Sequence, residues 1–334
     1  MNRLLAQPLT FSGLTLSSRL VMPPMASGKP SPDGSVTDSL LAYYAEKARG
    51  GYLGMVITEH AFVSPEGKAH EGQLSIARDE DIPGLRELAK LLHENGVKAF
   101  AQISHAGGAT GQAVTGLAPI SASAVKSPKA RPDAETPREM TAEEIAKTVL
   151  AFRDAARRAK EAGFDGVEIH SAHSYLLNQF YSPLTNRRTD NYTGSTLEGR
   201  LRIHLEIIHS IREAVGEGYP IALRLGAIDD LPGGTTLEDS VQTAQMLQAA
   251  GVDLLDISGG FCGPYRPGHK EQGYFGELAE AIKKGVTVPV LLTGGITDPE
   301  AAERLLEEGK ADLIGVGRAL LKDSDWAKKA LKKI

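Results

Sequence analysis

The chain has 334 residues, 41% of them hydrophobic, and its 37 basic and 42 acidic side chains leave a net charge of −5. This balance lacks the basic surface of a nucleic-acid-binding or membrane-surface protein. A single cysteine, Cys262, excludes an internal disulfide and a cysteine-only metal cluster. The N-terminus is too polar for a signal peptide, and no apolar run reaches the length of about 18 residues that a membrane span needs, so we expect a cytoplasmic protein.

Eight short apolar runs are predicted to be strands, and most of them are followed by an amphipathic helical pattern. They lie at 20–24, 54–59, 97–103, 165–170, 220–225, 253–258, 288–294 and 312–317. Their continuous apolar character is typical of parallel strands that helices cover. Eight alternations of strand and helix predict a protein of class α/β, a closed (β/α)8 TIM barrel that forms a single domain over residues 1–334.

Two of the predicted helices have clear end signals. One begins with a capping-box pattern, Thr141 followed by Glu144, and ends at Gly163. The helix that follows the seventh strand has Asp298 as its expected N-cap and Pro299 in its first position. These signals indicate where the two helices begin.

Chemistry in such barrels is carried by the residues at the carboxyl ends of the strands. Two loops at this end, about 104–140 and 171–196, are longer than a barrel requires, and long ordered loops are often functional. The strand ends place together Met25, Ala26, Glu59, His60, Gln102, His105, His170, His173, Arg224, Gly294, Gly295, Gly317 and Arg318. We therefore expect a converging set of hydrogen-bond donors with few carboxylates.

Glycine-containing turns follow the seventh and eighth predicted strands. Gly294 and Gly295 form one of them, and Gly317 precedes Arg318 in the other. Backbone N–H groups at such turns can approach an anion, and arginine adds a fixed positive charge. Tight turns alone would explain the glycines, but both turns stand where barrels commonly bind phosphate, so we predict a phosphate site.

His170 and His173 lie three residues apart after the fourth predicted strand, and Tyr175 follows two residues later. The pair could be structural, or it could bind a metal together with His105 or Glu59, although no standard ligand spacing supports this. Alternatively, two imidazole N–H groups could bind one substrate oxygen and stabilise negative charge on it. Tyr175 could then donate a proton to a carbanion, or it could simply pack with its hydroxyl at the surface.

Arg224 lies near the end of an apolar strand, where burial without a partner would be costly. We therefore expect it to face an anion or a group that becomes negatively charged. Gln102 offers both a donor and an acceptor, which suits the amide-like edge of a heterocycle. A phosphate, an imide-like ring and a developing negative charge together describe reduced flavin mononucleotide (FMN).

Several motifs of the chain stand in a recognisable order. The most specific is "GFDGVEIHSAHSYLLNQFYSPLTNRRTDNYTGS" at 163–195, and the others are "VMPPM", "QISHAG", "PREMTAEEI" and "ADLIGVGRALLKD". With these motifs the sequence resembles the Old Yellow Enzyme family of FMN-dependent NAD(P)H oxidoreductases over almost its whole length. The resemblance implies a TIM barrel that binds FMN non-covalently.

The same resemblance implies a role for each matching residue. Gln102 would bind the pyrimidine edge of the flavin, and Arg224 would lie beside its N1–C2=O side. The flavin would be lined by Pro23, Pro24, Met25, Ala26 and His60. Its phosphate would be held by Gly294, Gly295, Gly317 and Arg318.

The reaction implied by the resemblance has two halves. NAD(P)H reduces the flavin, whose N5 then gives hydride to the C=C bond of an α,β-unsaturated carbonyl or nitro compound. His170 and His173 would bind the oxygen of this substrate, and Tyr175 would donate the proton. The expected partner is thus a small molecule, with no nucleic acid, no membrane and no metal, and a homo-oligomer is possible.

Some positions depart from the family pattern. Ala26 stands where relatives often have a threonine or cysteine that hydrogen-bonds the flavin. Gly28 stands where some members place a substrate-pocket tyrosine, so we expect Gly28 to contribute to substrate binding through a wider pocket. Ser174 replaces a glycine, and Gly108 replaces an arginine. Few residues follow Arg318 and no cysteine cluster is present, which implies the single-domain form without an iron–sulfur cluster.

Two other functions remain as alternatives to an ene-reductase. The chain could be a flavin-binding redox sensor or electron carrier with little alkene turnover, which the sequence does not separate from the first hypothesis. A metal hydrolase or an aldolase is disfavoured because the strand ends offer neither a lysine for a Schiff base nor a His-x-His motif on the first strand.

Overall fold

The computed structural model of the protein describes residues 3–332. Its centre is a closed barrel of parallel strands, namely β3 (Leu20–Met22), β4 (Met55–Ile57), β6 (Lys98–Ser104), β9 (Gly166–Ser171), β10 (Ile221–Gly226), β11 (Leu254–Ser258), β12 (Val290–Thr293) and β13 (Leu313–Gly315). Each strand pairs with its two neighbours, and the pairing of β4 with both β3 and β6 closes the ring. This confirms the predicted TIM barrel, and each predicted strand coincides with one strand of the ring.

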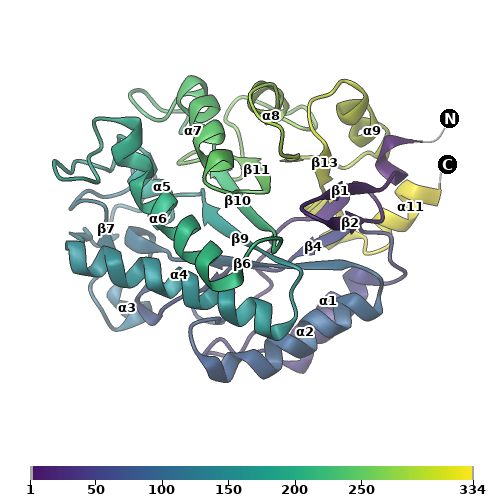
Figure 1. The fold of residues 1–334 in the computed structure, drawn as a ribbon, viewed down its shortest axis with the longest axis horizontal. Coiled ribbons are helices and arrows are strands. Elements are labelled where there is room, and N and C mark those ends of the chain that lie inside the picture. Colours follow the sequence, from purple (N-terminus) through teal and green to yellow (C-terminus); the bar gives the residue numbers. More distant parts are fainter. Residues whose placement is uncertain (1–2, 333–334) are drawn as a thin grey trace.

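Helices form an outer layer around these strands (Figure 1). The helices are α1 (Asp38–Ala48), α2 (Ile82–Glu94), α4 (Ala142–Ala162), α6 (Leu197–Val215), α7 (Leu237–Ala249), α8 (Gly276–Lys283), α9 (Pro299–Glu307), α10 (Arg318–Lys322) and α11 (Trp326–Lys332). The main hydrophobic core lies between these helices and the outward-facing side chains of the strands. None of the helices within residues 3–332 is long and apolar enough to cross a membrane.

The predicted helix ends are present. The side chain of Thr141 accepts a hydrogen bond from the N–H of Glu144, whose carboxylate accepts one from the N–H of Thr141. Gly163 ends this helix with a left-handed φ of 93°. The side chain of Asp298 caps α9 by accepting a hydrogen bond from the N–H of Glu300. Each such cap is typically worth about 1 kcal/mol, so local sequence fixes where both helices begin.

An N-terminal hairpin, which the strand pattern did not predict, packs against the inner residues of the barrel. Its strands are β1 (Leu9–Phe11) and β2 (Leu14–Leu16). Phe11 and Leu16 are buried in one cluster with inner residues of the barrel, and the rings of Phe11 and Phe100 lie 6.5 Å apart. Strands of three residues are too short to give a periodic signal, although they complete the inner core.

The two long loops of the barrel mouth are ordered and bound to each other. The first holds η4 (Gly107–Ala109), α3 (Gln112–Thr115), β7 (Ile120–Ser121) and β8 (Arg138–Glu139), and the second holds α5 (Leu176–Tyr181). The side-chain oxygen of Gln179 accepts hydrogen bonds from the N–H of Gly108 and the hydroxyl of Ser121. A side chain at position 108 would approach Pro137 to 2.9 Å, so the glycine there has a packing reason.

The turn after β9 has an unusual backbone. His173 and Ser174 both have left-handed conformations, with φ of 56° and 67°. The N–H of His173 donates to the carbonyl of Gly259, and the N–H of Ser174 donates to the side-chain oxygen of Asn178. Residues other than glycine adopt this conformation at a cost, and such strain is common at functional sites. The surrounding hydrogen bonds therefore hold a strained turn in place.

We expect Ser174→Gly to stabilise the protein, because glycine adopts a left-handed φ without strain. The gain should be about 0.5–1 kcal/mol, since part of the relieved strain is offset by the greater freedom of glycine in the unfolded chain. Thermal unfolding of the two proteins measures this difference. Ser174→Ala is the matched control, because it keeps the strain, and equal melting temperatures for the glycine and alanine variants would contradict the explanation.

Candidate functional site

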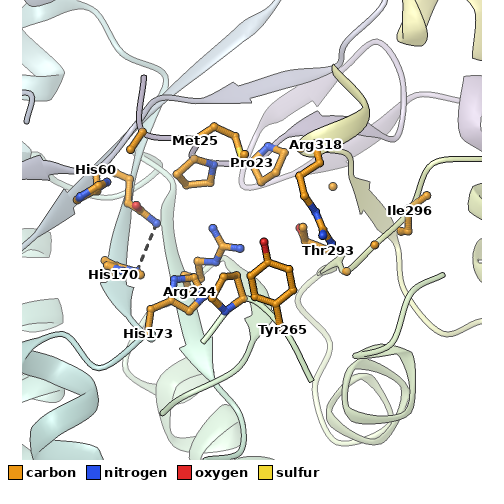
Figure 2. A pocket seen from close by; sticks show the side chains of 18 of the residues that line it. Pro23, Met25, His60, His170, His173, Arg224, Tyr265, Thr293, Ile296 and Arg318 are labelled. Carbon is orange, nitrogen blue, oxygen red and sulfur yellow. Dashed lines mark hydrogen bonds between the residues drawn. The ribbon is translucent and has the colours of Figure 1, made fainter. Parts of the chain in front are cut away.

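One cavity of about 330 Å³ opens at the carboxyl ends of the barrel strands. The histidines lie at one end of it and Arg318 at the other (Figure 2). The predicted site residues that line it are Pro23, Pro24, Met25, Ala26, His60, Gln102, His170, His173, Tyr175, Arg224, Gly294, Gly295, Gly317 and Arg318. Barrel closure has brought together residues that are almost 300 positions apart in sequence.

Gly28 is the exception among the predicted site residues, and its contribution to the substrate pocket stays a prediction. It is not among the residues that line the cavity. The preceding residue is Ser27, whose N–H and hydroxyl both donate to the carboxylate of Glu59, at 3.1 and 2.7 Å. Gly28 then has a left-handed φ of 64° with open space where a side chain would begin.

Several lining residues were not predicted. Pro264, Tyr265 and Tyr274 belong to the segment between β11 and α8, while Thr293 and Ile296 flank the glycine pair. Tyr265 is the most exposed of the large apolar side chains, at 55%. Strand-end reasoning identifies residues next to a strand but not those that a long connection folds back over the mouth. The proline- and glycine-rich sequence of this connection is the signal that could have been used.

His170, His173 and Tyr175 form the first end of the cavity. The ring of His170 lies 5.2 Å from that of His173 and 4.9 Å from that of Tyr175, with near-perpendicular planes. Nε2 of His173 is 2.7 Å from the hydroxyl of Ser258, and Nδ1 of His170 is 3.5 Å from the side-chain nitrogen of Gln102. Each imidazole therefore has one nitrogen engaged with the protein wall.

The surroundings keep these three residues uncharged. Burial, followed by the positive charge of Arg224 and by the neighbouring histidines, lowers the pKa of His170 and of His173 well below the ordinary value. Burial also raises the pKa of Tyr175 to about 12. At neutral pH the histidines are hydrogen-bonding groups without charge, and the phenol keeps its proton.

A buried ionic cluster lies beside the cavity, inside the barrel. Nε of Arg224 is 3.2 Å from a carboxylate oxygen of Asp256, its register partner on β11. On the other side, the side chain of Gln102 donates to Glu168, its partner on β9. Burial raises the pKa of Glu168 well above its ordinary value, and the charge of Asp256 raises it further. A protonated Glu168 leaves Arg224 and Asp256 as one neutral pair, with part of the guanidinium lining the cavity.

Arg318 and the glycine turns form the second end. The guanidinium of Arg318 donates to the hydroxyl of Tyr274 at 3.2 Å and lies 4.8 Å from the centre of the Tyr265 ring. Gly295 has a left-handed φ of 65°, and a side chain there would approach the Tyr274 ring to 2.8 Å. The turn is therefore restricted to glycine, which leaves backbone and a cation open toward the cavity.

The donor set fits the FMN that the resemblance implies. Arg318 and the glycine turns at one end suit a phosphate dianion. Arg224 and Gln102 also line the cavity, and a ring that accepts negative charge would need such donors. The walls around them are largely apolar, as expected of a cofactor site.

The metal alternative required a third ligand beside His170 and His173. The side chain of Glu59 is occupied by Ser27, and Nδ1 of His105 accepts a hydrogen bond from the N–H of Gly107. Within residues 3–332, no three histidine, cysteine, aspartate or glutamate side chains come together in a group that could hold a metal ion.

The chain is similar in sequence and in fold to known oxidoreductases. The chain is 46% identical over 323 residues to an NADH oxidase of Thermoanaerobacter brockii, which covers 95% of this chain and 49% of that protein. It is 41% identical to an NADPH dehydrogenase of Geobacillus thermodenitrificans, over 100% of this chain and 95% of that protein. A solved 2-naphthoyl-CoA reductase complex superposes with a TM-score of 0.93 at 30% identity, over 99% of this chain and 52% of that one.

The chain thus spans about half the length of the NADH oxidase and almost all of the NADPH dehydrogenase. The family model of the NADH:flavin oxidoreductase / NADH oxidase family matches residues 4–334. The protein belongs to this family, which confirms the resemblance to Old Yellow Enzyme that its motifs had indicated.

Proposed function

We propose that this chain reduces the C=C bond of α,β-unsaturated carbonyl or nitro compounds. Its family works with non-covalently bound FMN and with NADH or NADPH as reductant. The observation that carries the proposal is the presence of two neutral imidazoles and a protonated phenol in the cavity that also holds the anion-binding end. When bound, FMN supplies the hydride, and the chain's own residues bind the substrate and move the proton.

His170 and His173 bind the substrate oxygen. The side-chain nitrogen of Gln102 donates to Nδ1 of His170, which places the imidazole proton on Nε2. A serine hydroxyl can donate or accept, and where that of Ser258 donates to Nε2 of His173, the proton of this ring lies on Nδ1. Each ring then has one N–H for the oxygen, which becomes enolate-like or nitronate-like as the C=C bond is reduced. Donors fixed in advance stabilise such charge without reorganisation.

Tyr175 donates the proton to the substrate carbon next to the carbonyl or nitro group. It is the N-cap residue of α5, and its N–H is bonded to the carbonyl of Ala172, so the backbone that carries the phenol is fixed. Because its pKa is raised to about 12, the phenol is fully protonated at neutral pH. It also lies beside the His170 ring, which places the acid next to the oxygen-binding group.

The remaining lining residues hold the cofactor. The loop after β3, with Pro23, Pro24, Met25 and Ala26, forms one wall together with His60. Gln102 would bind the polar edge of the flavin ring, and Arg224 would compensate negative charge on it. Gly294, Gly295, Gly317 and Arg318 bind the phosphate.

Removal of the phosphate cation should weaken cofactor binding. We expect the purified protein to be yellow with about one FMN per chain, and we expect Arg318→Ala to lose FMN on dialysis, because a charge-assisted contact to phosphate is removed. Equilibrium titration of the apoprotein with FMN measures the effect. Arg304→Ala, which removes an exposed arginine of α9 outside the cavity, is the control. Equal affinity of the two variants for FMN would place the phosphate elsewhere.

Tyr175→Phe tests the reaction. The variant keeps the ring and removes the proton, so the rate of flavin reduction by NAD(P)H should change little. Anaerobic reoxidation of the reduced enzyme by cyclohexenone should slow by about 10²–10⁴-fold, the usual worth of a general acid. Stopped-flow absorbance of the flavin follows both steps. If wild type and variant are reoxidised equally fast, Tyr175 is not the proton donor. If the wild type is not reoxidised, the result favours a redox sensor or electron carrier.

The reoxidation rate should be nearly independent of pH. The pKa values of His170 and His173 are lowered, so both rings gain a proton only as the pH falls far below neutrality. The pKa of Tyr175 is raised to about 12, so its proton is lost only as the pH rises toward that value. We therefore expect a plateau from about pH 6 to about pH 9 in the reoxidation by cyclohexenone. A histidine-like step near pH 6.5 would contradict neutral imidazoles.

A further inference from the structure

His60 makes a contact that cofactor binding does not explain. It follows β4 at the barrel mouth, and its Nε2 lies 3.1 Å from the hydroxyl oxygen of Tyr175. The two rings are 5.6 Å apart and meet edge to face at 68°. The carbonyl of His60 accepts a hydrogen bond from the side chain of Gln73, which fixes the backbone that carries the ring. The imidazole is thus directed at the proton donor by the fold.

The His60 imidazole is neutral. Burial lowers its pKa to about 3, and electrostatic interactions with His70 and Arg224 lower it further. The ring of His70 lies 5.5 Å from that of His60, and the ring of His170 lies 6.4 Å from it, so two further imidazoles lie near the His60 ring. A neutral imidazole has a single N–H, and one nitrogen must act as acceptor.

The hydrogen bond between the two residues therefore has two possible directions. If Nε2 accepts, the phenol proton points at the imidazole and is not directed at a substrate. If Nε2 carries the N–H, it donates to the phenol oxygen and the phenol proton is free to point elsewhere. Only the second arrangement agrees with a phenol that protonates carbon, because one hydroxyl has one proton.

We propose that His60 is a positioning residue for Tyr175, whose Nε2–H donates to the phenol oxygen and directs the phenol proton at the substrate carbon. This inference rests on the proposed function. In the step itself the O–H bond of Tyr175 breaks, a C–H bond forms at the carbanion, and the electron pair of the O–H bond remains on the phenolate. The N–H of His60 stabilises this phenolate until a proton from water restores the phenol.

The proposal separates two roles that the position of His60 could serve. A residue that only forms the cavity wall would affect FMN binding, and removing it would slow the reaction whether or not Tyr175 can donate a proton. If His60 acts through the phenol, changing it should slow the reaction only in a protein that still has the Tyr175 hydroxyl. The two roles are distinguished by combining changes at both positions.

The test is a double-mutant cycle on the FMN-loaded enzyme. His60→Leu should slow anaerobic reoxidation by cyclohexenone by about tenfold to a hundredfold, the usual worth of a hydrogen bond to a developing charge. In the Tyr175→Phe background the same change should have no further effect. His60→Gln, which keeps an N–H donor, should recover most of the rate. A loss of equal size in both backgrounds would overturn the proposal.

The outcomes also separate this inference from the proposed function. If Tyr175→Phe alone leaves reoxidation unchanged, the proton donor has been misassigned and the proposed function loses its acid. If Tyr175→Phe is slow but His60→Leu reoxidises as fast as the wild type, only the positioning role fails.

A second measurement does not depend on turnover. Nitrogen NMR of the protein with ¹⁵N-labelled histidine, in which the His60 signals are those lost in His60→Gln, reports which nitrogen carries the proton. We expect a neutral ring with the proton on Nε2 at neutral pH. A proton on Nδ1 would mean that the phenol donates to the imidazole, which would overturn the proposed direction.

Discussion

Closure of the strand ring is the constraint on which the site depends. Because β4 pairs with both β3 and β6, the carboxyl ends of all strands in the ring meet around one opening. His60 after β4, His170 on β9 and Arg318 after β13 become neighbours of one cavity although none is near another in sequence. The hairpin that contains Phe11 packs against the inner residues of the same ring of strands. The ring therefore both contributes to the stability of the protein and positions the residues of the cavity.

Burial of the side chains then determines their protonation states in the site. Burial is the first cause of the lowered pKa values of His60, His170 and His173 and of the raised pKa of Tyr175. One physical effect thus keeps the three imidazoles uncharged and the phenol fully protonated at neutral pH. The positive charge of Arg224 acts in the same direction on the imidazoles, while Asp256 compensates that charge inside the barrel. The cavity is therefore prepared to receive negative charge rather than positive charge.

The sequence predicts those parts of the structure that local patterns determine. Continuous apolar runs identified the strands, and capping residues such as Thr141 and Asp298 identified helix ends. The strand-end rule then placed nearly all predicted site residues in one cavity. It missed Tyr265, which belongs to a long connection, and the lining of the cavity does not include Gly28, which the family resemblance had suggested. The position of Tyr265 beside Arg318 has no local pattern, because it depends on contacts between distant segments.

The left-handed turn after β9 shows why the side chains of the site need more than correct strands. His173 and Ser174 adopt a conformation that neither residue prefers, and contacts with Gly259 and Asn178 maintain it. The turn is short because α5 begins directly after Tyr175, and Leu176 is bonded to the carbonyl of His105 in the neighbouring loop. If His173 and Ser174 adopted ordinary backbone conformations, the phenol of Tyr175 would move relative to both His60 and His170. The contacts that hold this strained turn therefore fix the position of the Tyr175 phenol relative to the His170 ring, which strands alone cannot set.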